Sequence, residues 1–371
     1  MVKVNEIFDL KKKKYGLYNE LEMLPYLLEH NYVKFILYGT GEYAEWFIDW
    51  IGSIYNIKPK FIVDEGSQKK EVCGIPVLSY DKFANKKDEK YFVVVADEAY
   101  EEPEYKKRLL SQLKEKGAII IFNAHRVMRV VWPDWYVYIK HNIDKFEQLY
   151  NRLCDDISRD TLVHYLKTYV TGDRYDGVTF PEECKYWGGD GEQYSLFKRE
   201  PNEVVLNLGG CCGDTIFQFL KNGYSFEKII SVEADDTNLG YLNRSIGLLN
   251  DEIRQKIQVD NCYIGAESAT IDELYAGEKI SLIEMDIEGA ELSALETGIN
   301  LIKKNRPVLA ICVYHKKDDL IEIPEFISRN FENYILALRK YPSFLFEEYP
   351  GIQQINELVL YAIPKERFIE K

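Results

Sequence analysis

The residues best suited to chemistry in this 371-residue chain stand at the ends of apolar runs in its second half. Ser281-Leu-Ile-Glu-Met-Asp286 ends in a carboxylate, and Leu309-Ala-Ile-Cys-Val-Tyr-His315 ends in an imidazole. Ligands of open parallel sheets bind beyond the carboxyl ends of the strands, so both side chains should face one crevice. A His with the usual pKa of about 6.5 can take a proton from a hydroxyl. We expect Asp286, His315 and the nearby Glu288 to be catalytic, although Glu288 equally suits the start of a helix.

A glycine-rich loop lies earlier in the same half of the chain. Gly209-Gly-Cys-Cys-Gly213 follows the apolar run 204–208, and Glu233 follows the next such run. Loop amides can bind the carboxylate of an amino-acid tail, Glu233 can accept bonds from two ribose hydroxyls, and Asp260 can accept one from an adenine amino group. This pattern favours S-adenosylmethionine over NAD. The expected cofactor-binding residues are Asn207, Gly209, Gly210, Gly213, Asp214, Thr215, Glu233 and Asp260.

The seven cysteines form no Cys-x-x-Cys pair, and no His lies at zinc-ligand spacing from them. The pattern disfavours a disulfide framework and a structural zinc site, and we expect no metal. Cys211 and Cys212 are adjacent, which strains a disulfide between them. We interpret them as small side chains beside the ligand, with a redox role as the alternative.

A second glycine loop lies in the first half of the chain. Gly39-Thr-Gly41 stands between an apolar run and an expected helix, and Asp64 follows the next apolar run. A carboxylate there can hold a ribose diol. Gly39, Gly41 and Asp64 are therefore candidates for a second nucleotide or nucleotide-sugar site, and a tight turn needed for packing is the alternative.

Two series of alternating strands and helices must position these groups. Such alternation predicts an α/β fold with two Rossmann-like domains. Near the end, strands at 334–338 and 358–363 are separated by a loop, which predicts an antiparallel C-terminal strand pair. The expected divisions are an N-terminal helical segment at 1–30, a small Rossmann-like nucleotide-binding domain at 31–124, a helical connector and loop at 125–200, and the catalytic domain at 201–371.

The composition limits the kinds of partner. With 47 Lys and Arg against 61 Asp and Glu, the net charge is −14, which disfavours nucleic acid and anionic lipid. The beginning of the chain lacks an apolar signal core, and no apolar run is long enough to span a membrane. We therefore expect a cytoplasmic protein. The 28 Tyr are compatible with a sugar acceptor, and exposed aromatic side chains would allow a homodimer.

The second half resembles the FkbM-type S-adenosylmethionine-dependent methyltransferases. The segments that match are 205–215, Glu233, the motif at 282–292 (Leu-Ile-Glu-Met-Asp-Ile-Glu-Gly-Ala-Glu-Leu), 313–320 and 357–364. The resemblance implies a seven-stranded class I methyltransferase sheet at 201–371 and methylation of a hydroxyl, often on a saccharide or secondary metabolite.

Two residues depart from that family's pattern. Asn207 stands where the family usually has an acidic residue, and Glu284 stands where it commonly has Lys. Asn207 can still hold the cofactor's amino group through its carbonyl oxygen, but without full charge attraction. The first domain is also similar to the nucleotide-binding modules of sugar-modifying acyltransferases, through Gly39-x-Gly41, 61–64 and 74–77.

The main hypothesis is an S-adenosylmethionine-dependent O-methyltransferase (EC 2.1.1.-) acting on a saccharide, a nucleotide-linked sugar or a related metabolite. Asp286 and His315 would orient or deprotonate the acceptor, whose pocket we expect at 187–194 and 341–351. The alternative is a catalytically weak methyltransferase-like binding module for a glycan precursor or partner, as Asn207 suggests. A nicotinamide oxidoreductase is less favoured, because the first domain shows no convincing proton donor near its strand ends.

Overall fold

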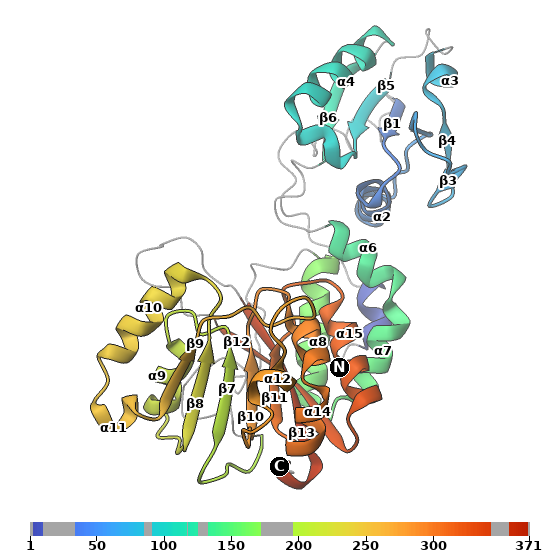
Figure 1. Ribbon diagram of the computed structural model, residues 1–371. Coiled ribbons are helices and arrows are strands. Elements are labelled where there is room, and N and C mark those ends of the chain that lie inside the picture. Colours follow the sequence, from blue (N-terminus) through green and yellow to red (C-terminus); the bar gives the residue numbers. More distant parts are fainter. Residues whose placement is uncertain are drawn as a thin grey trace. The chain divides into compact units, whose positions relative to one another are not determined.

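The computed structural model describes residues 3–9, 34–84, 91–116, 118–124, 133–171, 196–342 and 356–369 (Figure 1). The chain divides into two compact units, Met1–Ile143 with Val163–Val178, and Asp144–Leu162 with Thr179–Lys371. The expected connector at 125–200 is thus divided between the units. The expected acceptor segment at 187–194 lies outside the described residues, as does nearly all of 341–351.

The first unit contains a six-stranded sheet in the order β3-β4-β2-β1-β5-β6. The pairs β1-β2, β2-β4, β1-β5 and β5-β6 are parallel, and β3 is antiparallel to β4. This confirms an α/β unit, since helices connect the parallel strands. Its elements are η1 (Val4–Asp9), β1 (Lys34–Tyr38), α2 (Glu42–Tyr55), β2 (Ile62–Val63), β3 (Glu71–Val72), β4 (Ile75–Leu78), α3 (Tyr80–Ala84), β5 (Tyr91–Val95), η2 (Glu98–Glu101), α4 (Pro103–Glu115), β6 (Ala118–Asn123) and α6 (Pro133–His141).

The second unit contains a seven-stranded sheet in the order β12-β13-β11-β10-β7-β8-β9. The five strands from β11 to β9 are parallel, whereas β13 pairs antiparallel with both β11 and β12. The expected antiparallel C-terminal pair is therefore confirmed. The strands are β7 (Val204–Leu208), β8 (Lys228–Val232), β9 (Ile257–Asp260), β10 (Leu282–Met285), β11 (Val308–Cys312), β12 (Tyr334–Pro342) and β13 (Asn356–Pro364).

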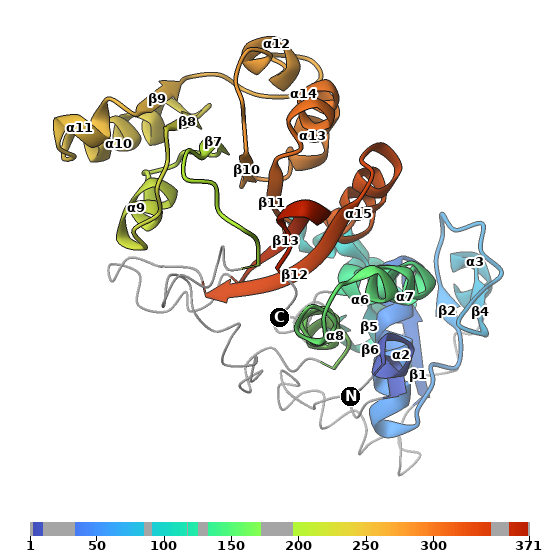
Figure 2. The same ribbon diagram turned by 90° about the horizontal axis from the view of Figure 1, so that it is seen from below.

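Helices lie on both faces of the second sheet, and Figure 2 shows α9 on one side with α12, α13 and α14 on the other. Because both faces are covered, the central strands are mostly apolar, and every residue of β7 and β11 is buried. The helices are α7 (Ile143–Arg152), α8 (Asp156–Thr171, which continues into the first unit), α9 (Asp214–Lys221), α10 (Asp236–Gly247), α11 (Asp251–Arg254), α12 (Ile271–Tyr275), α13 (Glu291–Thr297), α14 (Ile299–Asn305) and α15 (Asp319–Asn330); the 3-10 helix η5 (Lys365–Arg367) follows β13.

The register of the central strands fixes which polar residues meet. Asn207 of β7 lies opposite Ser231 of β8 on one side and Glu284 of β10 on the other. Beyond the strand end, the backbone N–H of Asp286 donates to the carbonyl of Leu208 at 3.0 Å. The glycine loop and the acidic motif are therefore neighbours at one edge of the sheet.

Candidate active site

A cavity of about 420 Å³ lies at the carboxyl ends of β7, β8, β10 and β11. This is the edge at which the sequence predicts ligand binding, and the volume lies within the range of small-molecule sites. Among the described residues that line it there is no Lys, Arg or His. The six charged lining residues are all acidic: Asp214, Glu233, Asp235, Glu284, Asp286 and Glu288.

The glycine loop packs directly against the end of β10. Gly209 has φ +95°, and a Cβ atom there would lie 2.0 Å from the carbonyl oxygen of Asp286. A Cβ on Gly210 would lie 2.6 Å from Oγ of Ser231. The backbone therefore passes where a side chain could not fit, and Gly213 leads into the N-terminus of α9 at the cavity wall.

Glu233 is held by backbone N–H groups at the end of β8. Its side chain accepts hydrogen bonds from Cys211 N at 2.7 Å and from Asp235 N at 2.8 Å, and the residue is only 7% exposed. The carboxylate thus joins the glycine loop to the loop after β8 and stays on the cavity wall. This placement agrees with the expected ribose contact.

Asn207 is buried beneath the cavity and does not line it. Its carbonyl oxygen accepts a bond from Ser231 Oγ at 2.7 Å, and its amide donates to Glu284 Oε2 at 2.7 Å. The oxygen that we expected to hold a cofactor amino group is therefore already bonded to Ser231. From the sequence, Glu284 was only a departure from a family pattern and not an expected site residue. In the structure its side chain lines the cavity.

Asp260 is also absent from the cavity wall. Its carboxylate accepts bonds from Tyr275 OH at 2.9 Å and from the amide of Gln258 at 2.9 and 3.0 Å. The wall near the end of β9 is formed instead by Cys262, Tyr263 and Ile264. These three residues, rather than Asp260, therefore lie where we expected the contact with adenine.

Asp286 and His315 do meet, as predicted, together with Glu291. His315 Nε2 lies 3.2 Å from Asp286 Oδ1, and its Nδ1 lies 2.9 Å from Glu291 Oε1. Burial alone would lower the pKa of His315, but the two carboxylates outweigh it and raise that pKa to about 10. His315 is therefore an imidazolium at neutral pH, and the expected proton acceptor role does not suit it.

Glu291 is a site residue whose importance the sequence reasoning missed. It is fully buried and accepts backbone bonds from Ile287 N at 3.0 Å and Gly289 N at 3.3 Å. Burial would raise its pKa, but the ion pair with His315 and the backbone donors lower it. A carboxylate at the first residue of α13 looks like an ordinary helix-start acid, so only the fold reveals that it fixes the loop and His315.

Asp286 and Glu288 differ in how firmly they are held. Asp286 is 35% exposed, lines the cavity and lies 3.3 Å from Tyr314 OH through each oxygen. The side chain of Glu288 is 91% exposed and lies 3.6 Å from His315 Nε2. Asp286 is therefore the better positioned of the two to contact a substrate.

The glycine loop of the first unit has a different character. Thr40 Oγ1 donates to Asp64 Oδ2 at 2.6 Å, and Asp64 Oδ1 accepts from the backbone N–H groups of Gly66 and Ser67 at 3.0 and 3.1 Å. A Cβ on Gly39 would lie 2.6 Å from the carbonyl of Ala96, whereas Gly41 has open space. These contacts explain the loop as a tight turn, and the second nucleotide site stays a prediction.

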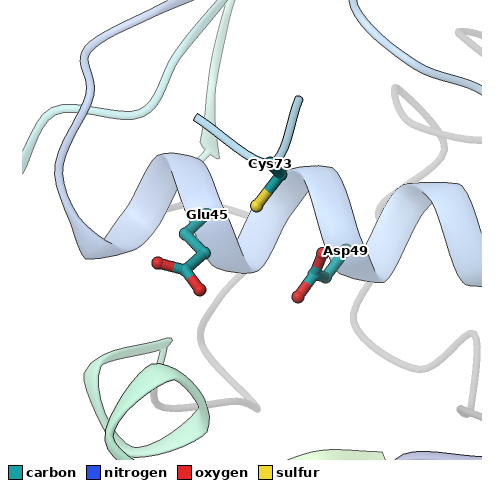
Figure 3. Close-up of side chains that lie close together, drawn as sticks. All are labelled: Glu45, Asp49 and Cys73. Atoms are coloured by element: carbon teal, nitrogen blue, oxygen red, sulfur yellow. The ribbon is translucent and has the colours of Figure 1, made fainter. Parts of the chain in front are cut away.

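Among the residues that the structure describes, two groups rich in acidic side chains are compact enough to share a cation. Glu45, Asp49 and Cys73 approach one another at α2 (Figure 3), and Asp286, Glu291 and His315 form the other group. Lys140 Nζ lies 3.0 Å from Glu45 and 2.5 Å from Asp49, and His315 already occupies the second group as a cation. The protein's own cations therefore compensate both groups.

The comparisons with known proteins concern mainly the second unit. Residues 199–341 match the family model described as Methyltransferase FkbM domain. The chain is also similar to the crystal structure of methyltransferase FkbM from Methylobacillus flagellatus KT, with a TM-score of 0.55 and 22% identity over 94% of both chains. This similarity shows a shared fold, consistent with a class I methyltransferase sheet.

Weaker structural similarities involve less than half of the chain. Precorrin-6y C5,15-methyltransferase from Geobacter metallireducens GS-15 and human methyltransferase 10 domain containing protein are each 13% identical over 44% of this chain, and over 81% and 72% of their own. Their TM-scores of 0.33 and 0.32 are too low to support conclusions. No curated protein sequence matches this chain. Within the described part of the chain, no helix is long and apolar enough to cross a membrane.

Proposed function

Starting from the methyltransferase FkbM domain formed by residues 199–341, we propose that this chain is an S-adenosylmethionine-dependent O-methyltransferase. The observation that carries the proposal is the cavity wall with six carboxylates and no described basic residue. S-adenosylmethionine carries two cations, a sulfonium and an ammonium, whereas NAD carries a diphosphate that this wall would repel. The charge of the cavity thus supports the cofactor that the glycine loop favours.

The residues on the wall fit the parts of this cofactor. Glu233 would accept from the ribose hydroxyls. The N–H groups of Gly209 and Gly210 already donate to the carbonyl of Val232, so the first turn of α9, at Asp214 and Thr215, would direct backbone N–H groups at the tail carboxylate. Cys262, Tyr263 and Ile264 would surround the base. When bound, S-adenosylmethionine supplies an electrophilic methyl group attached to sulfur.

Asp286 is the group that we assign to the acceptor hydroxyl. In the transfer, the hydroxyl oxygen forms a bond to the methyl carbon as the carbon–sulfur bond breaks, and the hydroxyl proton must leave. Asp286 would orient this hydroxyl and accept its proton as positive charge develops on oxygen. Alignment of the three reacting atoms in a site that excludes water would supply much of the remaining rate.

His315 would act through Asp286 rather than on the substrate. As an imidazolium between Asp286 and the buried Glu291, it would keep the Asp286 carboxylate correctly oriented. Glu291 would in turn hold the ring of His315 and the loop at 287–289. His315 and Glu291 are therefore positioning residues in this proposal.

We further propose that the acceptor is a hydroxyl of a saccharide, a nucleotide-linked sugar or a related metabolite. The resemblance of the motif at 282–292 to its family supports this substrate class.

Methyl transfer to a panel of sugars, nucleotide sugars and hydroxylated metabolites tests the function. We expect turnover by the wild type and a loss of at least 100-fold in kcat for Asp286→Asn, with little change in affinity for S-adenosylhomocysteine. Glu267→Gln, an exposed change that does not line the cavity, is the matched control. Cofactor binding by both proteins with no turnover on any acceptor would favour the binding-module alternative.

A further inference from the structure

Glu284 and Asn207 lie on adjacent strands, and each differs from the residue type that is usual at its position. They are register partners across β7 and β10, and the Asn207 amide donates to Glu284 Oε2 at 2.7 Å. In the family that this domain resembles, an acidic residue is usual at the position of Asn207, and Lys is common at the position of Glu284. Here the acid stands one strand away from its usual place, and the Lys is missing.

Glu284 presents its carboxylate to the cavity, and no cation from the described part of the chain lines this cavity beside it. Its partners are neutral donors, the Asn207 amide and Thr215 Oγ1 at 3.3 Å. Since a carboxylate can accept about four hydrogen bonds, capacity remains for a ligand. Burial, followed by the negative charges of Asp214 and Asp286, raises the pKa of Glu284 to about 8. A bound cation would relieve this unfavourable environment.

The position of Glu284 identifies which cation it would bind. It lies at the base of the cavity, between the ends of β7 and β10 and the first turn of α9, which would hold the tail carboxylate. The ammonium of an amino acid is attached to the same carbon as the carboxylate, so both must be bound in one place. The sulfonium must instead face the acceptor at Asp286.

We infer that Glu284 binds the ammonium group of the cofactor's amino-acid tail, with Asn207 and Thr215 orienting its carboxylate. This inference rests on the proposed function and assigns Glu284 the role that the sequence had given to Asn207. Asn207 then supports the site indirectly, because Ser231 fixes its carbonyl oxygen and leaves its amide directed at Glu284.

Binding of two ligands to two variants tests the inference. S-adenosylhomocysteine has the amino-acid tail, and 5′-methylthioadenosine lacks it. Glu284→Gln should weaken S-adenosylhomocysteine at least tenfold, because a charge-assisted hydrogen bond is lost, and should change 5′-methylthioadenosine less than threefold. Glu267→Gln, which removes one exposed charge outside the wall, should change neither. Equal effects on both ligands, or no effect, would overturn the inference.

A charge exchange provides a second test that does not depend on one variant. Glu284→Lys alone should abolish S-adenosylhomocysteine binding, and Asn207→Asp combined with Glu284→Lys should restore it by returning the acid to β7. Failure of the double variant to bind although it folds would count against the inference. If the wild type binds neither S-adenosylmethionine nor S-adenosylhomocysteine, the proposed function itself fails.

Proton release supplies a readout apart from affinity. Pairing with an ammonium should lower the pKa of Glu284 from about 8, so binding at pH 7.5 should release protons. Asp214 and Asp286 are the other titratable groups that raise this pKa. Calorimetry in buffers of different ionisation enthalpy should detect release by the wild type and none by Glu284→Gln. Equal release by both would contradict the assignment.

Discussion

At the scale of single residues, the charge of His315 changes the chemistry expected from the sequence. A histidine at a strand end suggested a proton acceptor, but two carboxylates hold it as an imidazolium. The sequence shows Asp286 and Glu291 near each other, yet their distances to His315 depend on how β10 and β11 align. The residue types of the site were therefore predictable, whereas the protonation state was not.

The His315 ion pairs should make stability depend on pH. Because folding raises the pKa of His315 from 6.5 to about 10, its stabilising contribution is complete below pH 6.5 and is lost as pH rises through 10. His315→Gln should therefore lower the free energy of unfolding by more at pH 6 than at pH 10, with a difference on the order of 2 kcal/mol. Urea unfolding at both values measures this.

The matched control is His141→Gln in the first unit. His141 is 58% exposed and lies 2.9 Å from Glu45, so its ion pair should contribute little. We expect a cost of at most about 0.5 kcal/mol at either pH. An equal, pH-independent loss in both variants would contradict the charge assigned to His315.

At the scale of elements, the apolar strands were the most predictable part. The runs at 204–208 and 308–312 form fully buried parallel strands, and the antiparallel C-terminal pair occurs where the loop between strands suggested it. Cross-strand partners were less predictable, because the bonds of Asn207 depend on residues 24 and 77 positions away. The sequence alone therefore assigned the contact with the cofactor's amino group to Asn207 and not to Glu284.

A buried ion pair connects the C-terminal helix η5 to the sheet. Arg367 donates to Glu203, which is fully buried, at 2.5 Å and to the carbonyl of Ser281 at 2.6 Å. Arg367→Met removes the closest cation to Glu203 and should cost about 3–5 kcal/mol of unfolding free energy. Urea unfolding of the purified variant measures this loss.

The exposed pair of Arg306 and Glu366 is the comparison. Its side chains are 34% and 56% exposed, with 2.6 Å between Arg306 Nε and Glu366 Oε1. Arg306→Met should cost only about 1 kcal/mol, since solvent screens this pair. Similar losses for both variants would show that burial of Glu203 does not determine the effect.

At the scale of the whole molecule, the proposed chemistry belongs to the second unit. The net charge of −14 argued against polyanionic partners. Six of the acidic residues line the cavity, where they would favour a ligand that carries positive charge. The first unit is a parallel α/β unit in which the glycine loop is explained as a turn. Its expected nucleotide ligand and the expected homodimer stay predictions.

The most direct test of the central claim is calorimetric titration of S-adenosylhomocysteine into the wild type, Gly209→Ala and Gly277→Ala. A Cβ at Gly209 would meet the Asp286 carbonyl at 2.0 Å and requires a positive φ, whereas Gly277 has no atom within 4 Å. We predict binding at one site in the wild type and Gly277→Ala, and at least tenfold weaker binding in Gly209→Ala. Absence of binding to the folded wild type at millimolar ligand would contradict the account.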